Sequence, residues 1–434
     1  MREMKDSSEN WLGSIPAKWK MARIKDVIKI LTDYTANGSF ADLAKNVKYL
    51  DYEDFARLVR LTDLRSKLNN PGVYVSQKSY EYLGKSKLYG KEILVANVGA
   101  YAGLFCEMPN VDIPATLGPN TFLIRTNSKM YSHYLYYLGN THFVKEQLAQ
   151  KAISSAQPKL NKTDIKTAYI IIPPILEQKK IISFLDSQCS EIDAISADIQ
   201  KEIEILEQYK RSVITEAVTK GLNPDVEMKD SGIEWVESIP AHWDVRPLYY
   251  YFAERKKKNY LGQEQNLLSL SYGKVIRKDI NTSEGLLPDS FNGYNIIEPG
   301  DIVLRLTDLQ NDKRSLRTGL VKEHGIITSA YVTLKAAKEV VPEYFHYLLH
   351  AYDVMKVLYN MGNGVRQGLN YSELSKMHIV APPLDEQKNI AARLDCVCKG
   401  IESIIASKKQ QLAVIDSYKK SLIYEYVTGK KEIV

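Results

Sequence analysis

The chain has 434 residues, of which 44% are hydrophobic and 25% are charged, and its net charge is +6. At ~100–200 residues per domain, this length predicts two or three domains, and the ordinary composition excludes a largely disordered chain. The sequence has no apolar run of about 18 residues and no apolar leader, and four cysteines do not make a disulfide framework. We therefore expect a cytoplasmic protein that does not contact a membrane.

Positive charge is concentrated in the first part of the chain. Residues 11–176 carry a net charge of +9, whereas residues 177–222 and 223–234 each carry −3. A basic block of this kind favours a polyanionic partner such as nucleic acid.

The sequence contains an internal repeat. The segment Trp11–Trp19, WLGSIPAKW, recurs at Trp235–Trp243 as WVESIPAHW, and we name it the Trp-Trp motif. A longer pair, which we name the Pro-Pro motif, covers residues 173–219 and 382–428 and agrees at 19 of 47 positions without a gap. The order of Trp-Trp motif, variable block and Pro-Pro motif occurs twice, which indicates a duplication.

Each Pro-Pro motif leads into a predicted long helix. The prolines end the strand-like runs before them, and apolar residues then repeat with 4,3 spacing from Leu185 and from Leu394. A heptad seam in two copies predicts that helices 177–219 and 386–428 pack together as a coiled coil. The residues expected in this seam are Leu185, Ile192, Ile199, Ile203, Leu206, Leu394, Ile401, Ile405, Leu412, Ile415 and Leu422. The sequence leaves open that the two helices are independent and that each belongs to its own domain.

The variable blocks, 20–172 and 244–381, look little alike. Strand patterns occur at 93–97, 121–125, 301–306 and 331–334, and helical patterns occur at 132–151 and 342–359. One weak echo lies near the ends of the blocks, where Gln157–Asn161 is similar to Gln367–Asn370. We expect each block to form one mixed domain, and the chain to have an α+β fold.

No motif for catalysis stands out. Ser79–Ser86 lacks the first glycine of a phosphate-binding loop. His346 and His350 stand four residues apart on one helix face without an evident third metal ligand, and the side chains of Cys396 and Cys398 diverge. We therefore expect that the chain is not an enzyme and holds no metal.

Both blocks contain basic clusters interleaved with tyrosines and amides. Lysine mainly contacts phosphate, whereas arginine and glutamine can form bidentate contacts with base edges. The alternative for each single residue is an ordinary solvated charge. In the first block the candidates for DNA contact are Arg57, Arg60, Arg65, Lys85, Lys87, Lys91, Tyr101, Gln157 and Lys159. In the second block they are Arg255, Lys256, Lys257, Lys258, Tyr272, Lys274, Arg277, Lys278, Gln310, Lys313, Arg314, Arg317, Arg366 and Gln367.

This arrangement resembles the DNA specificity subunit of a type I restriction-modification system over nearly the whole chain. The two pairs of motifs, the segment 300–319 and the Gln157 and Gln367 echoes carry the resemblance. It implies two target-recognition domains separated by an antiparallel two-helix coiled coil, with an internal pseudo-two-fold repeat. The expected segments are 1–172 for the first domain, 173–222 for the first long helix, 223–381 for the linker and second domain, and 382–434 for the second long helix.

The resemblance also implies a function in host defence. Each domain is expected to read one half of a bipartite, asymmetric site in double-stranded DNA, and the helices are expected to set the unread gap. Two methylation subunits and two restriction/motor subunits are the expected partners, and they methylate adenine and cleave unmodified DNA. S-adenosylmethionine, ATP and Mg are expected on those partners, and no cofactor is expected on this chain.

Two other functions stay open at this point. One is a scaffold whose helices bind protein partners while its blocks read no DNA. The other is a self-sufficient restriction-methylation enzyme, against which the missing catalytic motifs count.

Overall fold

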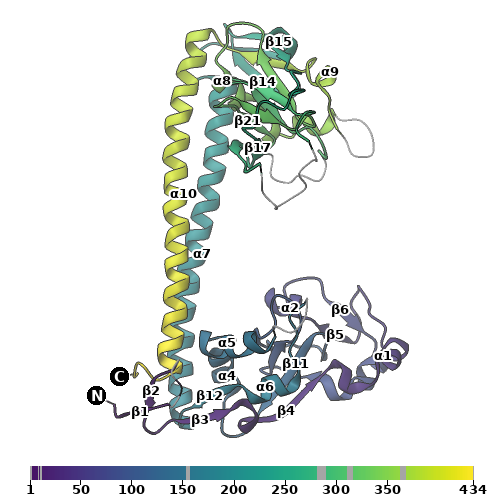
Figure 1. Ribbon diagram of the computed structural model, residues 1–434, viewed down its shortest axis with the longest axis vertical. Helices are drawn as coiled ribbons and strands as arrows, with labels where there is room; N and C mark the ends of the chain where they lie inside the picture. Colours follow the sequence, from purple (N-terminus) through teal and green to yellow (C-terminus); the bar gives the residue numbers. More distant parts are fainter. Residues whose placement is uncertain are drawn as a thin grey trace. The chain divides into compact units, whose positions relative to one another are not determined.

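The computed structural model describes residues 2–7, 9, 12–152, 157–280, 290–309, 316–361 and 368–433. Contacts group the chain into two compact units, Met1–Asp198 with Gln410–Val434, and Ile199–Lys409. Helices α7 (Ile175–Lys220) and α10 (Leu384–Val427), teal and yellow in Figure 1, each contribute one half to each unit. This grouping cuts through both helices, whereas the predicted segments keep each helix whole.

The first unit contains a mixed domain built on two four-stranded sheets. One sheet has the order β4-β11-β8-β9 and is antiparallel, and the other has the order β6-β5-β10-β7, in which β5 and β10 run parallel. The strands are β1 (Met4–Asp6), β2 (Ser14–Pro16), β3 (Lys20–Arg23), β4 (Ile28–Asp33), β5 (Ala56–Val59), β6 (Val73–Val75), β7 (Lys87–Leu88), β8 (Ile93–Ala96), β9 (Phe105–Glu107), β10 (Ala115–Leu117), β11 (Thr121–Thr126) and β12 (Tyr169–Ile172). The shorter helices are α1 (Phe40–Asn46), α2 (Leu61–Arg65), α3 (Gln77–Tyr82), α4 (Ser132–Gly139), α5 (His142–Lys151) and α6 (Lys162–Thr167).

The second unit also contains a mixed domain. Its four-stranded antiparallel sheet has the order β16-β23-β20-β21, and β17-β18 and β19-β22 form antiparallel pairs. The strands are β13 (Met228–Ile233), β14 (Val236–Pro240), β15 (Asp244–Pro247), β16 (Phe252–Glu254), β17 (Leu268–Ser271), β18 (Lys274–Arg277), β19 (Asn295–Ile297), β20 (Ile302–Leu304), β21 (Thr318–Leu320), β22 (Gly325–Ile327), β23 (Val332–Ala336) and β24 (His378–Ala381). The shorter helices are α8 (Pro342–Val354) and α9 (Tyr371–Leu374).

The two domains share one topology, although their sequences look little alike. The sheet β4-β11-β8-β9 corresponds strand for strand to β16-β23-β20-β21. A parallel bridge between Leu267 and Ile326 joins the two smaller pairs of the second domain into the order β18-β17-β22-β19. This order and its strand directions match β6-β5-β10-β7, so the duplication includes the variable blocks.

The weak sequence echo at the block ends has a structural counterpart. The backbone N–H of Leu160 donates to the carbonyl of Asn97 just after β8, and the N–H of Leu369 donates to the carbonyl of Leu306 just after β20, each at 2.8–2.9 Å. The next residue of each echo is an asparagine whose side chain caps a short helix, α6 or α9. The echo therefore marks the point where each block turns back from its sheet toward its Pro-Pro motif.

The second tryptophan of each Trp-Trp motif lies in a domain core. Trp19 and Trp243 are 0% exposed, and each indole N–H donates to the glutamate of a Pro-Pro motif, Glu177 at 2.8 Å and Glu386 at 3.1 Å. Trp11, the first tryptophan of the first motif, lies outside the described residues. The repeated Trp and Glu residues thus join the start of each block to the start of a long helix.

The repeated glutamine of the Pro-Pro motif is also a structural residue. Gln178 is 0% exposed, donates to the carbonyl of Pro173 at 3.0 Å and accepts from the N–H of Tyr131 at 3.0 Å. Gln387 is 4% exposed and makes the equivalent bonds to Pro382 and Val341 at 2.9 and 3.0 Å. Each glutamine therefore fastens the start of α4 or α8 to a long helix.

The two long helices pair in antiparallel fashion within each unit. In the first unit the rings of Phe184 and Tyr426 are 4.5 Å apart, and Lys419 bonds to Asp193 at 2.6 Å. In the second unit Lys210 bonds to Glu402 at 2.5 Å, and Lys408 pairs with Glu202. The residue numbers rise along α7 as they fall along α10, which confirms the predicted antiparallel coiled coil. All eleven residues predicted for the seam are buried or half-buried, whereas Ile195 and Val414 beside it are exposed.

Several predicted elements have different ends in the structure. The helix predicted at 132–151 is two helices, α4 and α5, because the side chain of Asn140 donates to the carbonyls of Tyr136 and Phe105 and ends the first helix. The helix predicted at 342–359 ends at Val354. The strand predicted at 301–306 is shorter, at Ile302–Leu304.

Candidate nucleic-acid interface

Four predicted residues of the first domain come together at one place. The guanidinium carbon of Arg65, at the end of α2, lies over the ring of Tyr101 at 4.2 Å from its centroid. The turn that carries Tyr101 begins at Gly99, whose N–H donates to the carbonyl of Pro158 at 2.8 Å, and Val98 forms a bridge with Lys159. Arg65, Tyr101, Gln157 and Lys159 are all exposed, and we name them the Arg65 surface.

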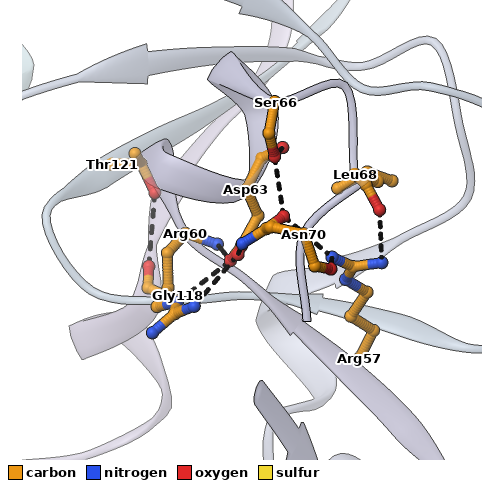
Figure 2. A network of polar contacts seen from close by, with 8 residues as sticks. All are labelled: Arg57, Arg60, Asp63, Ser66, Leu68, Asn70, Gly118 and Thr121. Atoms are coloured by element: carbon orange, nitrogen blue, oxygen red, sulfur yellow. Dashed lines mark hydrogen bonds and ion pairs between the residues drawn. The ribbon is translucent and has the colours of Figure 1, made fainter. Parts of the chain in front are cut away.

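A buried polar network supports the loop that carries Arg65 (Figure 2). Asp63 is 0% exposed and accepts from the guanidinium of Arg60 at 3.0 Å and from Asn70 Nδ2 at 2.6 Å. Burial acts to raise the pKa of Asp63, but hydrogen bonds from Arg60 and Asn70 outweigh it and leave the pKa below its usual value. Asp63 is therefore a carboxylate that holds the two ends of the loop together.

Arg57 serves the same loop from inside the domain. It is 8% exposed, and its guanidinium donates to the carbonyls of Leu68 and Asn70, both at 3.0 Å. Lys67 and Leu68 have φ angles of +51° and +64°, a conformation that such residues adopt only when surrounding contacts fix it. Arg57 was predicted to contact DNA, but its side chain is buried and bonded to the loop, a position that does not favour direct contact. Asp63 and Asn70 were not among the predicted residues, and their one signal in the sequence is an aspartate three residues after Arg60, a capping pattern.

The lysines of the first domain form a separate group around β7. Lys87 Nζ lies 4.4 Å from the ring centroid of Tyr80, and the backbone N–H of Lys85 donates to Asn37 Oδ1 at 2.9 Å. Lys85 and Lys91 are exposed, and Lys91 has a φ of +65° in the turn before β8. Exposed lysines of this kind suit phosphate contact.

Arg255–Lys258 is a run of four basic residues in the second domain. Two of them are bonded to the domain, and two are exposed. Arg255 is half-buried and donates to Asp301 Oδ1 at 3.0 Å, and Lys258 Nζ donates to the carbonyl of Gly293 at 2.9 Å. Lys256 and Lys257 are exposed, and Lys256 pairs with the neighbouring Glu254 at 2.8 Å. Arg255 and Lys258 thus hold the run against the domain, and two lysines face solvent.

Four further candidates of the second domain lie on the β17-β18 hairpin or directly after it. Tyr272 occupies its turn with a φ of +47° and is 70% exposed. Lys274 pairs with Glu402 of α10 at 3.1 Å, and the Arg277 guanidinium pairs with Glu323. Lys278 follows the hairpin and is exposed.

Arg317 is a second predicted DNA contact whose side chain is buried. Its side chain is 1% exposed, and it donates to the carbonyls of Thr307 at 2.8 Å and Asp308 at 2.9 Å, next to the buried Asp353. These bonds assign the side chain to the loop after β20, a position that does not favour direct contact with DNA. The candidates outside the described residues are Gln310, Lys313, Arg314, Arg366 and Gln367.

The two histidines and two cysteines considered as metal ligands do not form a metal site within the described residues. Within the described part of the chain, no group of three or more His, Cys, Asp or Glu side chains could hold a metal. Burial lowers the pKa of His346 and of His350 to about 4, so both rings are neutral at pH 7. Cys396 is exposed and Cys398 is buried, at different faces of α10.

None of the described helices is both long and apolar enough to cross a membrane.

Comparisons with known proteins agree with this architecture. Residues 16–205 and 314–414 match the family described as type I restriction modification DNA specificity domain. The putative type I restriction enzyme MjaX specificity subunit of Methanocaldococcus jannaschii is 26% identical, with 96% of this chain and 95% of that protein covered. The type I restriction enzyme EcoKI specificity subunit of Escherichia coli is 20% identical, with 96% and 90% covered.

A solved structure from work on the assembly and conformational transition of the type I R-M system shares the fold. Its TM-score is 0.67 at 14% identity, and the match covers 96% of this chain and 99% of that one. The family match extends over more than half of the sequence and includes parts of both blocks and both long helices. The chain therefore belongs to the type I restriction-modification DNA specificity family, the non-catalytic DNA-recognition components of these systems.

Proposed function

We propose that this chain reads a bipartite, asymmetric DNA site, with one half-site for each domain. The observation that carries the proposal is that the two domains share a topology but carry different surfaces. The β5-β6 connection holds the loop Arg60–Asn70, whereas the equivalent β17-β18 connection is a tight turn at Tyr272–Gly273. Two copies of one scaffold with different loops favour two unlike half-sites.

The contacts available at these surfaces suit double-stranded DNA. Exposed lysines contact phosphates and position the protein, and arginines and amides read base edges. The first domain presents exposed Arg65, Gln157 and Lys159, and the second presents exposed Lys256 and Lys257. Family membership supports DNA as the partner rather than a scaffold without readout.

We further propose that chemistry belongs to partner subunits in the cytoplasm. Two methylation subunits would bind S-adenosylmethionine and methylate adenine after it leaves the base stack, and two restriction/motor subunits would use ATP and Mg to cleave unmodified DNA. The names of the relatives support this, since each is the specificity subunit of a type I restriction enzyme.

A map of methylated adenines in the genome of a host carrying the complete system tests the proposal. A two-part motif with a fixed gap is expected. Exchange of residues 20–172 for the corresponding block of a relative should change one half of the motif, and exchange of residues 244–381 should change the other half. A continuous motif, or a change in both halves after one exchange, would contradict the proposal.

An incubation of the purified chain alone with S-adenosylmethionine and DNA provides the control for catalysis. No methyl transfer is expected, and methylation by the chain alone would show that it is an enzyme. A shift of mixed-sequence DNA in a gel, with and without a methylation subunit, separates a DNA reader from a protein-binding scaffold.

A further inference from the structure

The arginines predicted to contact DNA differ in what they already bind. Five of the six that the structure describes donate to acceptors within their own domain, and these are Arg57, Arg60, Arg255, Arg277 and Arg317. The guanidinium of Arg65 has no hydrogen bond or ion pair with any described residue, and it lies over the ring of Tyr101. Its guanidinium is therefore the one in this set with its donors unused.

The position of Arg65 over Tyr101 suits recognition of a base. A guanidinium that lies over a ring uses its flat face for the cation–π contact, and its N–H groups point outward in the plane. Those N–H groups form a fork that fits the O6 and N7 acceptors of guanine in the major groove. The ring also restricts the rotamers of the arginine, which lowers the entropy lost when it binds.

The buried polar network holds the backbone that carries Arg65 in a fixed position. Asn70 Nδ2 donates to Asp63, and Asn70 Oδ1 accepts from Arg57 at 3.2 Å, so the start and the end of the loop are tied together. The side chain of Ser66, directly after Arg65, donates to Asn70 Oδ1 at 2.6 Å (Figure 2). The side chains of Arg57, Asp63, Ser66 and Asn70 thus hold the backbone on both sides of Arg65.

We propose that Arg65 is the residue of the first domain that reads a guanine, and that the Arg57–Asp63–Asn70 network positions it. This inference rests on the proposed function and deepens it, because it assigns one base pair of one half-site to one side chain. Asn70 acts through Arg65 and is a positioning residue.

The test uses the full chain assembled with its methylation subunits. In the methylation map, R65K should relax one G·C position in the half-site that changes when residues 20–172 are exchanged, and the other half-site should stay the same. In competition binding to four duplexes that differ at this position, the preference for guanine should fall about 10- to 100-fold, because lysine lacks the bidentate fork.

Three further variants separate the reading of a base from general binding to DNA. Y101F keeps the ring and should keep the preference for guanine, whereas Y101A should reduce it. K67N, on the same loop, should change the affinity for all four duplexes equally, since an exposed lysine contacts phosphate.

The role of Asn70 requires a double variant. N70A should reduce the preference at the same base pair as R65K, and the double variant should lose no more preference there than R65K alone, because both changes act on one contact. Additive losses would assign Asn70 to general stability.

The inference is overturned if R65K weakens binding to all four duplexes equally or leaves the motif unchanged. R65Q is the second variant if R65K does not fold, and the same two results decide it. If the wild-type assembly yields no two-part motif, the proposed function itself fails, and that result is distinct from a two-part motif that R65K does not alter.

Discussion

His133 of the first unit lies between two carboxylates. Its Nδ1 lies 2.7 Å from Glu107 Oε2 on β9, and its Nε2 lies 2.7 Å from Asp186 Oδ1 on α7. Burial disfavours the charged ring, but the hydrogen bonds and charges of these carboxylates outweigh it and raise the pKa of His133. The rings of Tyr136 and Tyr137 pack against the imidazole, and Tyr137 also donates to Asp186.

The raised pKa predicts how stability depends on pH. The charged ring stabilises the fold fully below the unfolded pKa of about 6.5, and this contribution is lost as pH rises through the higher folded pKa. H133Q should therefore lower the unfolding temperature most near pH 5.5–6, and the difference from wild type should shrink toward pH 8.5. H142Q is the control, since His142 is mostly exposed and pairs with Glu146 on the same helix. A difference that stays constant over this range would contradict the prediction.

The burial and the bonding partners of single arginines could not be predicted from the sequence. The basic clusters could be found in the sequence, but the exposure of each arginine could not be predicted. Arg65 faces solvent, whereas Arg57 and Arg317 are buried. The buried arginines donate mainly to backbone carbonyls of turns, and a carbonyl leaves no mark in the sequence. The partner of Arg65 is a tyrosine on another loop, and only the fold brings the two together.

At the level of elements, the repeated glutamines explain why the Pro-Pro motif recurs. Gln178 and Gln387 each bond to a proline carbonyl before the long helix and to the N–H of a residue before α4 or α8. A buried amide with both of its ends bonded fixes the angle between two helices, because neither partner can move without leaving a polar group unpaired.

Replacement of Gln178 by methionine should destabilise the first unit, and replacement of Gln387 should destabilise the second unit by a similar amount. Q178M and Q387M keep the shape but leave a buried N–H and a carbonyl unpaired, at a cost of ~1–3 kcal/mol. Hydrogen exchange should show lost protection at the amide of Tyr131 in Q178M and of Val341 in Q387M. Q208M, at an exposed position of α7, should change the stability by no more than ~0.5 kcal/mol. Equal protection in Q178M and wild type would contradict the assigned bond.

Elements with strong periodicity were predicted best. The helix expected at 177–219 is α7, Ile175–Lys220, because a heptad seam repeated over its whole length leaves little freedom in its ends. The break between α4 and α5 was not predictable, because Asn140 ends the helix through a bond to Phe105 on a distant strand.

At the level of the whole molecule, the proposed function makes the length of the two helices a determinant of the DNA motif. One heptad inserted at matching positions of α7 and α10 adds ~10 Å of helix, which is the length of about three base pairs. We expect the gap in the methylation motif to lengthen by up to that amount, while both half-sites keep their sequences.

The same heptad inserted into α7 alone is the control. The ion pairs Lys419–Asp193 and Lys408–Glu202 could then no longer both form, because α7 would be longer than α10 between them. The thermal stability should therefore fall. A gap that does not change in the doubly inserted protein would contradict the role of the helices as a spacer.

The repeated motifs predicted the duplication, but the sequence did not predict that the two blocks share one topology. The blocks keep the strand order and the strand directions, which depend on apolar pattern rather than on identity. The connections between the strands differ, as the β5-β6 loop and the β17-β18 turn show.

This division between sheet and loop has a consequence for inheritance. A strand framework that tolerates loops as different as Arg60–Asn70 and Tyr272–Gly273 can accept a foreign loop or a foreign block at the same junctions. Recombination between lineages could therefore create a new target in one step, without a period in which the subunit fails to fold.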